Sequence, residues 1–148
     1  METIFNQQTI DNFVDRVKRL NADKNAEWGK MTPYQMVKHC ILSEQMYLGD
    51  TKYKRIFIGR LFGKLALKSV VKDKSPMKKN EPTHPTFKIK GDGDLDEQKN
   101  TWIDLIKRYG QKDSFAEFVH PFFGKMTRDQ IGLYVYKHTD HHLRQFGV

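Results

Sequence analysis

Three histidines fall within five residues, in the run H-T-D-H-H at positions 138–142. Residues four apart on a helix lie on one face, one turn apart, so His138 and His142 can present their rings to a common point. Helical metalloenzymes use this spacing to offer two imidazoles to one ion. His141 lies at the edge of the same face, but one helix rarely supplies three ligands to a tetrahedral ion. We therefore expect a third ligand from another helix.

Three further histidines could supply that ligand. His84 lies between prolines in a basic loop, and His120 precedes a proline just before the last expected helix. His39 instead falls in the middle of an expected helix, on a face that otherwise looks buried. His138 and His142 are also mid-helix residues, so two neighbouring helices can bring all three side chains to a similar depth. We predict that His39, His138 and His142 hold a divalent ion such as Zn or Ni.

A purely structural role for these histidines stays open at this point. A histidine on an apolar helix face is commonly a hydrogen-bonded core or boundary residue, and H-x-x-x-H alone is a weak motif. The run H-T-D-H-H could equally form part of a solvated surface. The spacing permits a metal site without requiring one.

The two helices that would carry the ligands begin with the same signal. M-T-P-Y-Q-M (31–36) and M-T-R-D-Q-I (126–131) each contain a Thr with a Gln three residues later. This is a capping box, in which the two side chains satisfy each other's free backbone amides. The resulting helices are expected to run to about Leu48 and about Phe146. Apolar periodicity predicts two more helices, over 9–21 and 94–109.

Most of the positive charge belongs to one segment. Residues 52–90 contain twelve Lys or Arg residues and two acids, whereas the whole chain has a net charge of +8. The first half has Arg60, Lys64, Lys68 and Lys72 at four-residue spacing and predicts a basic amphipathic helix whose apolar side covers a bundle. The second half is a loop rich in Pro, Gly and Lys. Binding to an anionic membrane surface stays open, whereas nucleic acid is disfavoured as a partner.

Length and pattern favour one helical domain spanning 1–148. Four helices without alternating strands predict an all-α fold, a four-helix bundle with a long basic crossover between its second and third helices. Cys40 is the single cysteine, which excludes an intrachain disulfide. The first residues lack a secretory pattern, and the apolar stretch 56–67 is short and interrupted by charge. We expect a cytoplasmic protein without a transmembrane segment.

Three stretches carry a resemblance to a known family: W-G-K-M-T-P-Y-Q-M-V-K-H (28–39), H-P-F-F-G-K-M-T (120–127) and Y-K-H-T-D-H-H-L-R-Q-F-G (136–147). Together they resemble the DinB-like superfamily, in particular a branch ending in H-x-x-H-H-x-x-Q-F. The resemblance implies a bundle with up-down-down-up connectivity. It also implies a metal held by one histidine of the second helix and two of the last, which here are His39, His138 and His142.

The resemblance implies a class of activity without naming a substrate. Members with known activity are divalent-metal enzymes, including thiol S-transferases that use bacillithiol and a mycothiol-dependent isomerase. We therefore expect a metal-dependent enzyme, a thiol S-transferase or a small hydrolase, which acts on a small molecule and could use a low-molecular-weight thiol. The alternative is a catalytically silent bundle that serves as an interaction or scaffold protein and could form a homodimer.

The sequence offers candidates to orient the ligands but none for a general base. Imidazole ligands need an acceptor for their second nitrogen, and Gln35 and Gln145 each lie about one turn from a ligand. Asp140 is two residues from each ligand of its own helix and should face away. Glu44 is five residues from His39 and is no better placed.

Overall fold

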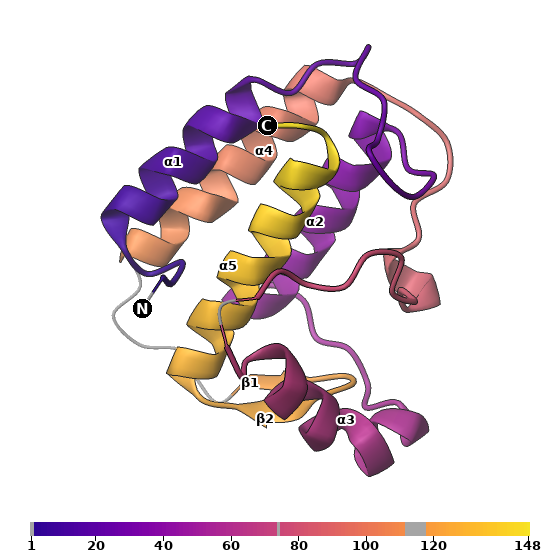
Figure 1. Cartoon of the computed structure of the whole chain (residues 1–148), viewed down its shortest axis with the longest axis vertical. Helices are drawn as coiled ribbons and strands as arrows, with labels where there is room; N and C mark the ends of the chain where they lie inside the picture. The colour runs from indigo at the N-terminus through magenta and orange to yellow at the C-terminus, as the bar shows by residue number, and fades with distance from the viewer. Residues whose placement is uncertain (1, 74, 112–117) are drawn as a thin grey trace.

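A computed structural model describes residues 2–73, 75–111 and 118–148. Within these residues the fold is mainly helical, with a small antiparallel hairpin (Figure 1). The α-helices are α1 Gln7–Lys18, α2 Pro33–Leu48, α3 Phe57–Val70, α4 Leu95–Arg108 and α5 Arg128–Gln145; the 3-10 turns are η1 Pro85–Phe87 and η2 Tyr109–Gln111; the strands are β1 Phe118–His120 and β2 Gly124–Met126. The predicted predominance of helix is confirmed.

Both predicted capping boxes are present, and they start the two helices that carry the histidines. The Thr32 hydroxyl accepts from the Gln35 amide at 3.2 Å, and the Gln35 side chain accepts from the Thr32 amide at 3.1 Å. Thr127 and Gln130 repeat the arrangement at 3.2 and 2.9 Å. Local sequence therefore fixes where α2 and α5 begin. The helix starts in turn set how many turns into each helix the histidines lie.

The other two predicted helices are also present, but α1 ends at Lys18 instead of the predicted residue 21, and its start is shifted too. Helix α4 begins after Asp94, whose side chain accepts from the backbone amide of Glu97 at 3.0 Å. Helix α1 begins at Gln7 instead of the predicted residue 9, because the Asn6 side chain accepts from the amides of Gln8 and Thr9. The Asn cap outweighed the apolar periodicity that we used to place the start.

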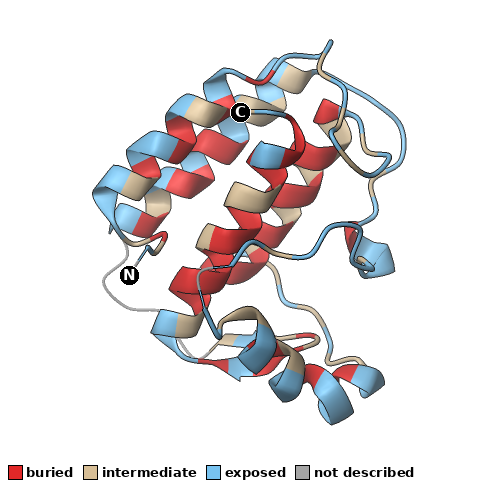
Figure 2. Cartoon of the chain, viewed as in Figure 1, coloured by how far each residue is buried: buried red, intermediate tan, exposed pale blue. Residues whose placement is uncertain are grey.

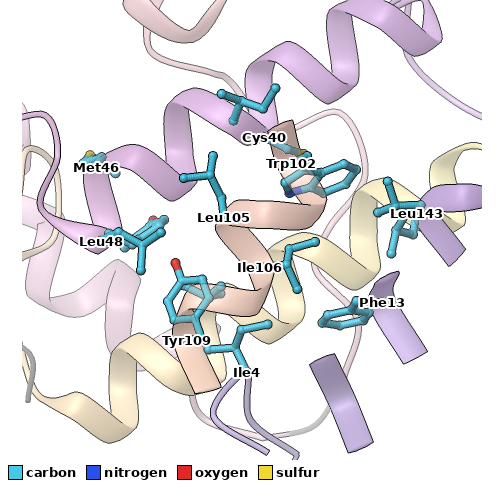
Figure 3. Packing of buried hydrophobic residues seen from close by; sticks show 14 of the residues in the cluster. Ile4, Phe13, Cys40, Met46, Leu48, Trp102, Leu105, Ile106, Tyr109 and Leu143 are labelled. Carbon is cyan, nitrogen blue, oxygen red and sulfur yellow. The ribbon is translucent and has the colours of Figure 1, made fainter. Parts of the chain in front are cut away.

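The core lies between α1, α2, α4 and α5. Helix α4 contacts both α1 and α2, and α5 contacts the same two helices. Figure 1 shows α1 and α4 side by side, with α2 and α5 adjacent to them. The close-up in Figure 3 shows the largest buried side chains meeting between these helices, among them Phe13, Trp102, Ile106, Tyr109 and Leu143. Cys40 is buried in the same cluster, and burial raises the pKa of its thiol well above the ordinary value.

The hairpin was missing from the sequence prediction, which expected no strands. Strands β1 and β2 pair antiparallel, with His120 opposite Gly124. Nδ1 of His120 accepts from the backbone amides of Phe122 and Phe123, each at 3.1 Å, and so closes the turn between the strands. Gly124 has φ of +85°, a conformation that suits glycine. An all-α description is therefore wrong in this detail, because strands of three residues leave almost no alternating pattern.

Helix α3 exists as predicted, but its apolar side does not cover the bundle. It packs against the hairpin through Gly59 and Gly63, which are buried, as is Leu67. A Cβ atom at Gly59 would lie 2.5 Å from the carbonyl oxygen of Phe122, so the glycines permit backbone contact. Figures 1 and 2 show α3 beside the hairpin, with most of its surface exposed. Among the described residues, no helix is long and apolar enough to cross a bilayer.

Candidate metal centre

The structure brings together the three histidines predicted as ligands. His39 comes from α2, and His138 and His142 come from α5, one turn apart. Each offers one ring nitrogen, and these nitrogens lie within 4.8 Å of one another. All three residues are buried, with exposed fractions of 6, 9 and 7%. Their proximity therefore follows from the packing of α2 against α5, as the sequence predicted.

The spacing of the ring nitrogens fits one ion. Nε2 of His39 lies 3.2 Å from Nε2 of His138. Two imidazole nitrogens bound tetrahedrally at the usual metal distance are separated by about 3.3 Å. These two histidines thus already have the separation of two ligands of one ion. His142 closes the triangle, with its ring centre 4.8 Å from that of His39 and 4.6 Å from that of His138.

The orientation of His39 is set by a backbone carbonyl. Its Nδ1 lies 3.0 Å from the carbonyl oxygen of Phe87, in the 3-10 turn η1 of the crossover. A carbonyl can only accept, so Nδ1 carries the hydrogen and Nε2 keeps its lone pair. Gln35, a candidate for this role if its geometry permitted, instead caps α2 and donates to the carbonyl of Gly91 at 3.0 Å. The geometry therefore assigns the role to the carbonyl of Phe87.

The orientation of His142 is set by Gln145, as predicted. Its Nδ1 lies 2.9 Å from the Gln145 side-chain oxygen. The amide nitrogen of Gln145 donates to the carbonyl of Trp28 at 2.7 Å, so the oxygen of that amide faces the histidine. His142 therefore donates through Nδ1 and keeps its lone pair on Nε2. Such acceptors fix the tautomer and the ring orientation of metal-binding histidines.

Within the cluster, more ring nitrogens have a lone pair than there are N–H groups to donate to them. His39 and His142 both keep a lone pair on Nε2, and His138, when neutral, has a single ring hydrogen to share. Burial lowers the pKa of all three histidines, and for His138 the neighbouring His142 and His39 lower the pKa further. Neutral imidazole is the form that binds metals. The donor set therefore suits a cation better than it suits protons.

Comparison with known proteins identifies a family. Residues 4–147 match the model of a family described as "Protein of unknown function (DUF1569)". This chain belongs to the DUF1569 family. A search of curated proteins gave no match, and a search of solved structures gave none either. The DUF1569 match covers every helix and strand described above, and with them all three clustered histidines.

The remaining histidines of this DUF1569 chain lie outside the cluster. His141 packs its ring 5.2 Å from that of Trp28 and 5.1 Å from that of His142. His84 is exposed and caps η1. His120 belongs to the hairpin, where burial, together with the charge of Arg55, lowers its pKa to about 3. A structural role thus explains His120.

The described residues offer no carboxylate to this DUF1569 site, because the one potential metal-binding group contains histidines alone. Asp140 points away as predicted and pairs with Arg16 at 2.8 Å. Glu44 is buried in the core, where its carboxylate accepts from the Tyr109 hydroxyl at 2.5 Å and from the Thr139 hydroxyl at 3.3 Å. Neither acid is available as a base beside the histidines.

Proposed function

We propose that this protein is a divalent-metal enzyme in which His39, His138 and His142 hold one ion, such as Zn or Ni. The observation that carries the proposal is the pair of acceptors, Phe87 and Gln145, that leave Nε2 of two buried histidines unprotonated within one cluster. Metal-binding histidines use such acceptors to fix their tautomer and ring orientation.

We further propose that the fold is a DinB-like four-helix bundle. Its helices are α1, α2, α4 and α5, connected up-down-down-up, and α3 and η1 belong to the crossover between α2 and α4. The motifs at 28–39, 120–127 and 136–147 support this proposal, as do the mutual contacts of the four helices. The same resemblance supports the choice of ligands, because it expects one from the second helix and two from the last.

The reaction that we favour is thiol S-transfer to a small-molecule substrate, with a low-molecular-weight thiol as cosubstrate. A divalent ion held by His39, His138 and His142 would supply Lewis acidity that lowers the pKa of a bound thiol or water. A thiol has a pKa of about 8.5 and water one of about 15.7, so a site without a carboxylate base favours the thiol. Hydrolysis of a small molecule is the second candidate reaction.

Metal content tests the proposal most directly. The untagged protein is purified without added metal or chelator, and its metal is measured by mass spectrometry beside His138→Ala and the control Lys107→Ala. We expect near-stoichiometric metal in the wild type and in Lys107→Ala, because Lys107 is an exposed residue of α4 and is not one of the clustered histidines. His138→Ala should lose the metal. A full equivalent retained by His138→Ala would refute the ligand assignment.

A catalytically silent interaction or scaffold protein, which could dimerise, is the alternative. The exposed apolar residues of α3 favour it, because such surfaces commonly serve in binding. On this alternative the wild type takes up no metal during titration, and added zinc leaves its thermal stability unchanged. A ligand that binds only the folded state must raise stability, so this measurement separates the two functions.

A further inference from the structure

Helix α3 carries an unusual concentration of exposed apolar side chains. We name these five residues the α3 stripe: Phe57 77% exposed, Ile58 57%, Leu61 64%, Phe62 57% and Leu65 73%. In the part of the chain that the structure describes, one other large apolar residue, Val119, is exposed. Figure 2 shows α3 as a largely exposed helix at the periphery of the molecule. A contiguous patch of this kind marks an interaction surface.

The α3 stripe faces away from the protein. Gly59, Gly63 and Leu67 recur every four residues and form the buried side of the helix. At about 100° per residue, the centre of the stripe lies roughly 170° around the helix from that buried side. The glycines bring the helix backbone against Phe122, so α3 cannot rotate its stripe inward without losing this contact. The stripe is therefore built for a surface outside this chain.

Basic side chains border the stripe. Arg60, Lys64 and Lys68 are exposed and follow one edge of it at four-residue spacing. Residues 52–72 contain seven Lys or Arg residues and no acid. A second copy of α3 has no carboxylate to pair with these cations, so a dimer through the stripe would bring like charges together. An anionic bilayer surface complements both the apolar stripe and the cations beside it.

We propose that α3 docks this protein onto an anionic membrane surface. The helix lies in the plane of the interface, with the stripe at the boundary of the acyl chains and Arg60, Lys64 and Lys68 among the lipid headgroups. Its 14 residues are too few to span a bilayer, which takes about 20. Long basic side chains can keep their charge at headgroup level while their stems contact apolar surface. This proposal concerns a different surface from the histidines and does not depend on the metal.

Vesicle co-sedimentation tests the docking surface with the full chain. Binding is compared between vesicles of phosphatidylcholine alone and vesicles that also contain phosphatidylserine. The variants are the double substitution Leu61→Ser with Phe62→Ser, the charge reversal Lys64→Glu and the matched reversal Lys107→Glu on the exposed side of α4. All these residues are exposed, so the variants should keep the wild-type circular dichroism spectrum.

We expect the wild type to bind only the vesicles that contain phosphatidylserine. Both α3 variants should bind roughly tenfold more weakly or worse, and Lys107→Glu should bind as the wild type does. Equal losses of vesicle binding in Lys64→Glu and Lys107→Glu would show that binding depends on net charge alone, and this result would overturn the proposal. So would absence of vesicle binding, including the case in which the stripe instead supports a concentration-dependent dimer or the capture of an acidic protein.

Discussion

The side-chain oxygen of Gln145 lies 2.9 Å from Nδ1 of His142, three residues earlier on α5. If His142 binds metal through Nε2, this contact holds its ring in place. We expect Gln145→Ala to weaken metal binding about 10- to 100-fold, the usual effect of losing such an acceptor. Competition with a chromogenic chelator measures the affinity.

The matched control for that substitution is Gln130→Ala, on the same helix. Gln130 belongs to the capping box of α5, eight residues before His138. Its loss should cost about 1 kcal/mol of stability and leave metal affinity unchanged. Similar affinities for Gln145→Ala and the wild type would show that the contact does not orient a ligand.

The contribution of Glu44 to folding stability should fall as pH rises. Burial raises the pKa of its carboxyl from 4.5 to about 7. Below pH 4.5 the Glu44 carboxyl is protonated in both the folded and the unfolded chain. Between pH 4.5 and 7 it ionises in the unfolded chain first, and this ionisation stabilises the unfolded state. The loss from this group amounts to roughly 3 kcal/mol and is complete above pH 7.

Substitution of Glu44 by Gln isolates this contribution. In urea unfolding from pH 4.5 to 7.5, the stability of Glu44→Gln relative to the wild type should rise by roughly 3 kcal/mol, because the amide does not ionise and the buried histidines contribute equally to both proteins. Glu97→Gln, at an exposed acid of α4, should keep the wild-type dependence. Parallel curves for Glu44→Gln and the wild type would mean that Glu44 is already ionised in the folded protein.

Gly63 should be intolerant of even a methyl group. A Cβ atom there would collide with the backbone of Phe122, so α3 and the hairpin would have to move apart. We expect Gly63→Ala to lower stability by about 1–3 kcal/mol, although alanine is the better helix former. Ser69→Ala, at an exposed position of the same helix, should change stability by less than about 0.5 kcal/mol. Urea midpoints compare the two, and equal midpoints would contradict the close contact.

Lys137 should anchor the end of α3. Its ammonium group donates to the carbonyl oxygens of Val70 at 2.5 Å and Asp73 at 3.1 Å, and its residue is only 6% exposed. Lys137→Met keeps an unbranched side chain that is one atom shorter and removes the ammonium donor. We expect faster amide hydrogen exchange in the last turn of α3 and unchanged exchange in α1. Uniform acceleration across both helices would instead indicate global destabilisation.

The candidate site was predictable from sequence where its geometry depends on helix periodicity and helix starts. The capping boxes at Thr32 and Thr127 fix the registers of α2 and α5, and the i, i+4 spacing fixes the relation between His138 and His142. The contact between His142 and Gln145 is local to one helix and was predicted for the same reason. Local signals of this kind need no knowledge of the tertiary fold.

The parts that escaped prediction depend on tertiary contacts. The hairpin is held by His120 accepting from two backbone amides, a contact that no alternating pattern announces. The exposed face of α3 follows from Gly59 and Gly63, because a glycine pair on one side lets that side become the packed one. Periodicity alone identified the helix as amphipathic and assigned the wrong side to the interior.

The carbonyl of Phe87 has a consequence for how the site tolerates mutation. This group faces Nδ1 of His39, and every residue type at position 87 would supply the same carbonyl. Alanine scanning can therefore remove the acceptor for His142 but not the one for His39. Of the two acceptors that orient the histidines, the one for His39 is a main-chain group. Its position depends on the path of the crossover, so insertions or deletions there should disturb it more than a change of side chain at position 87.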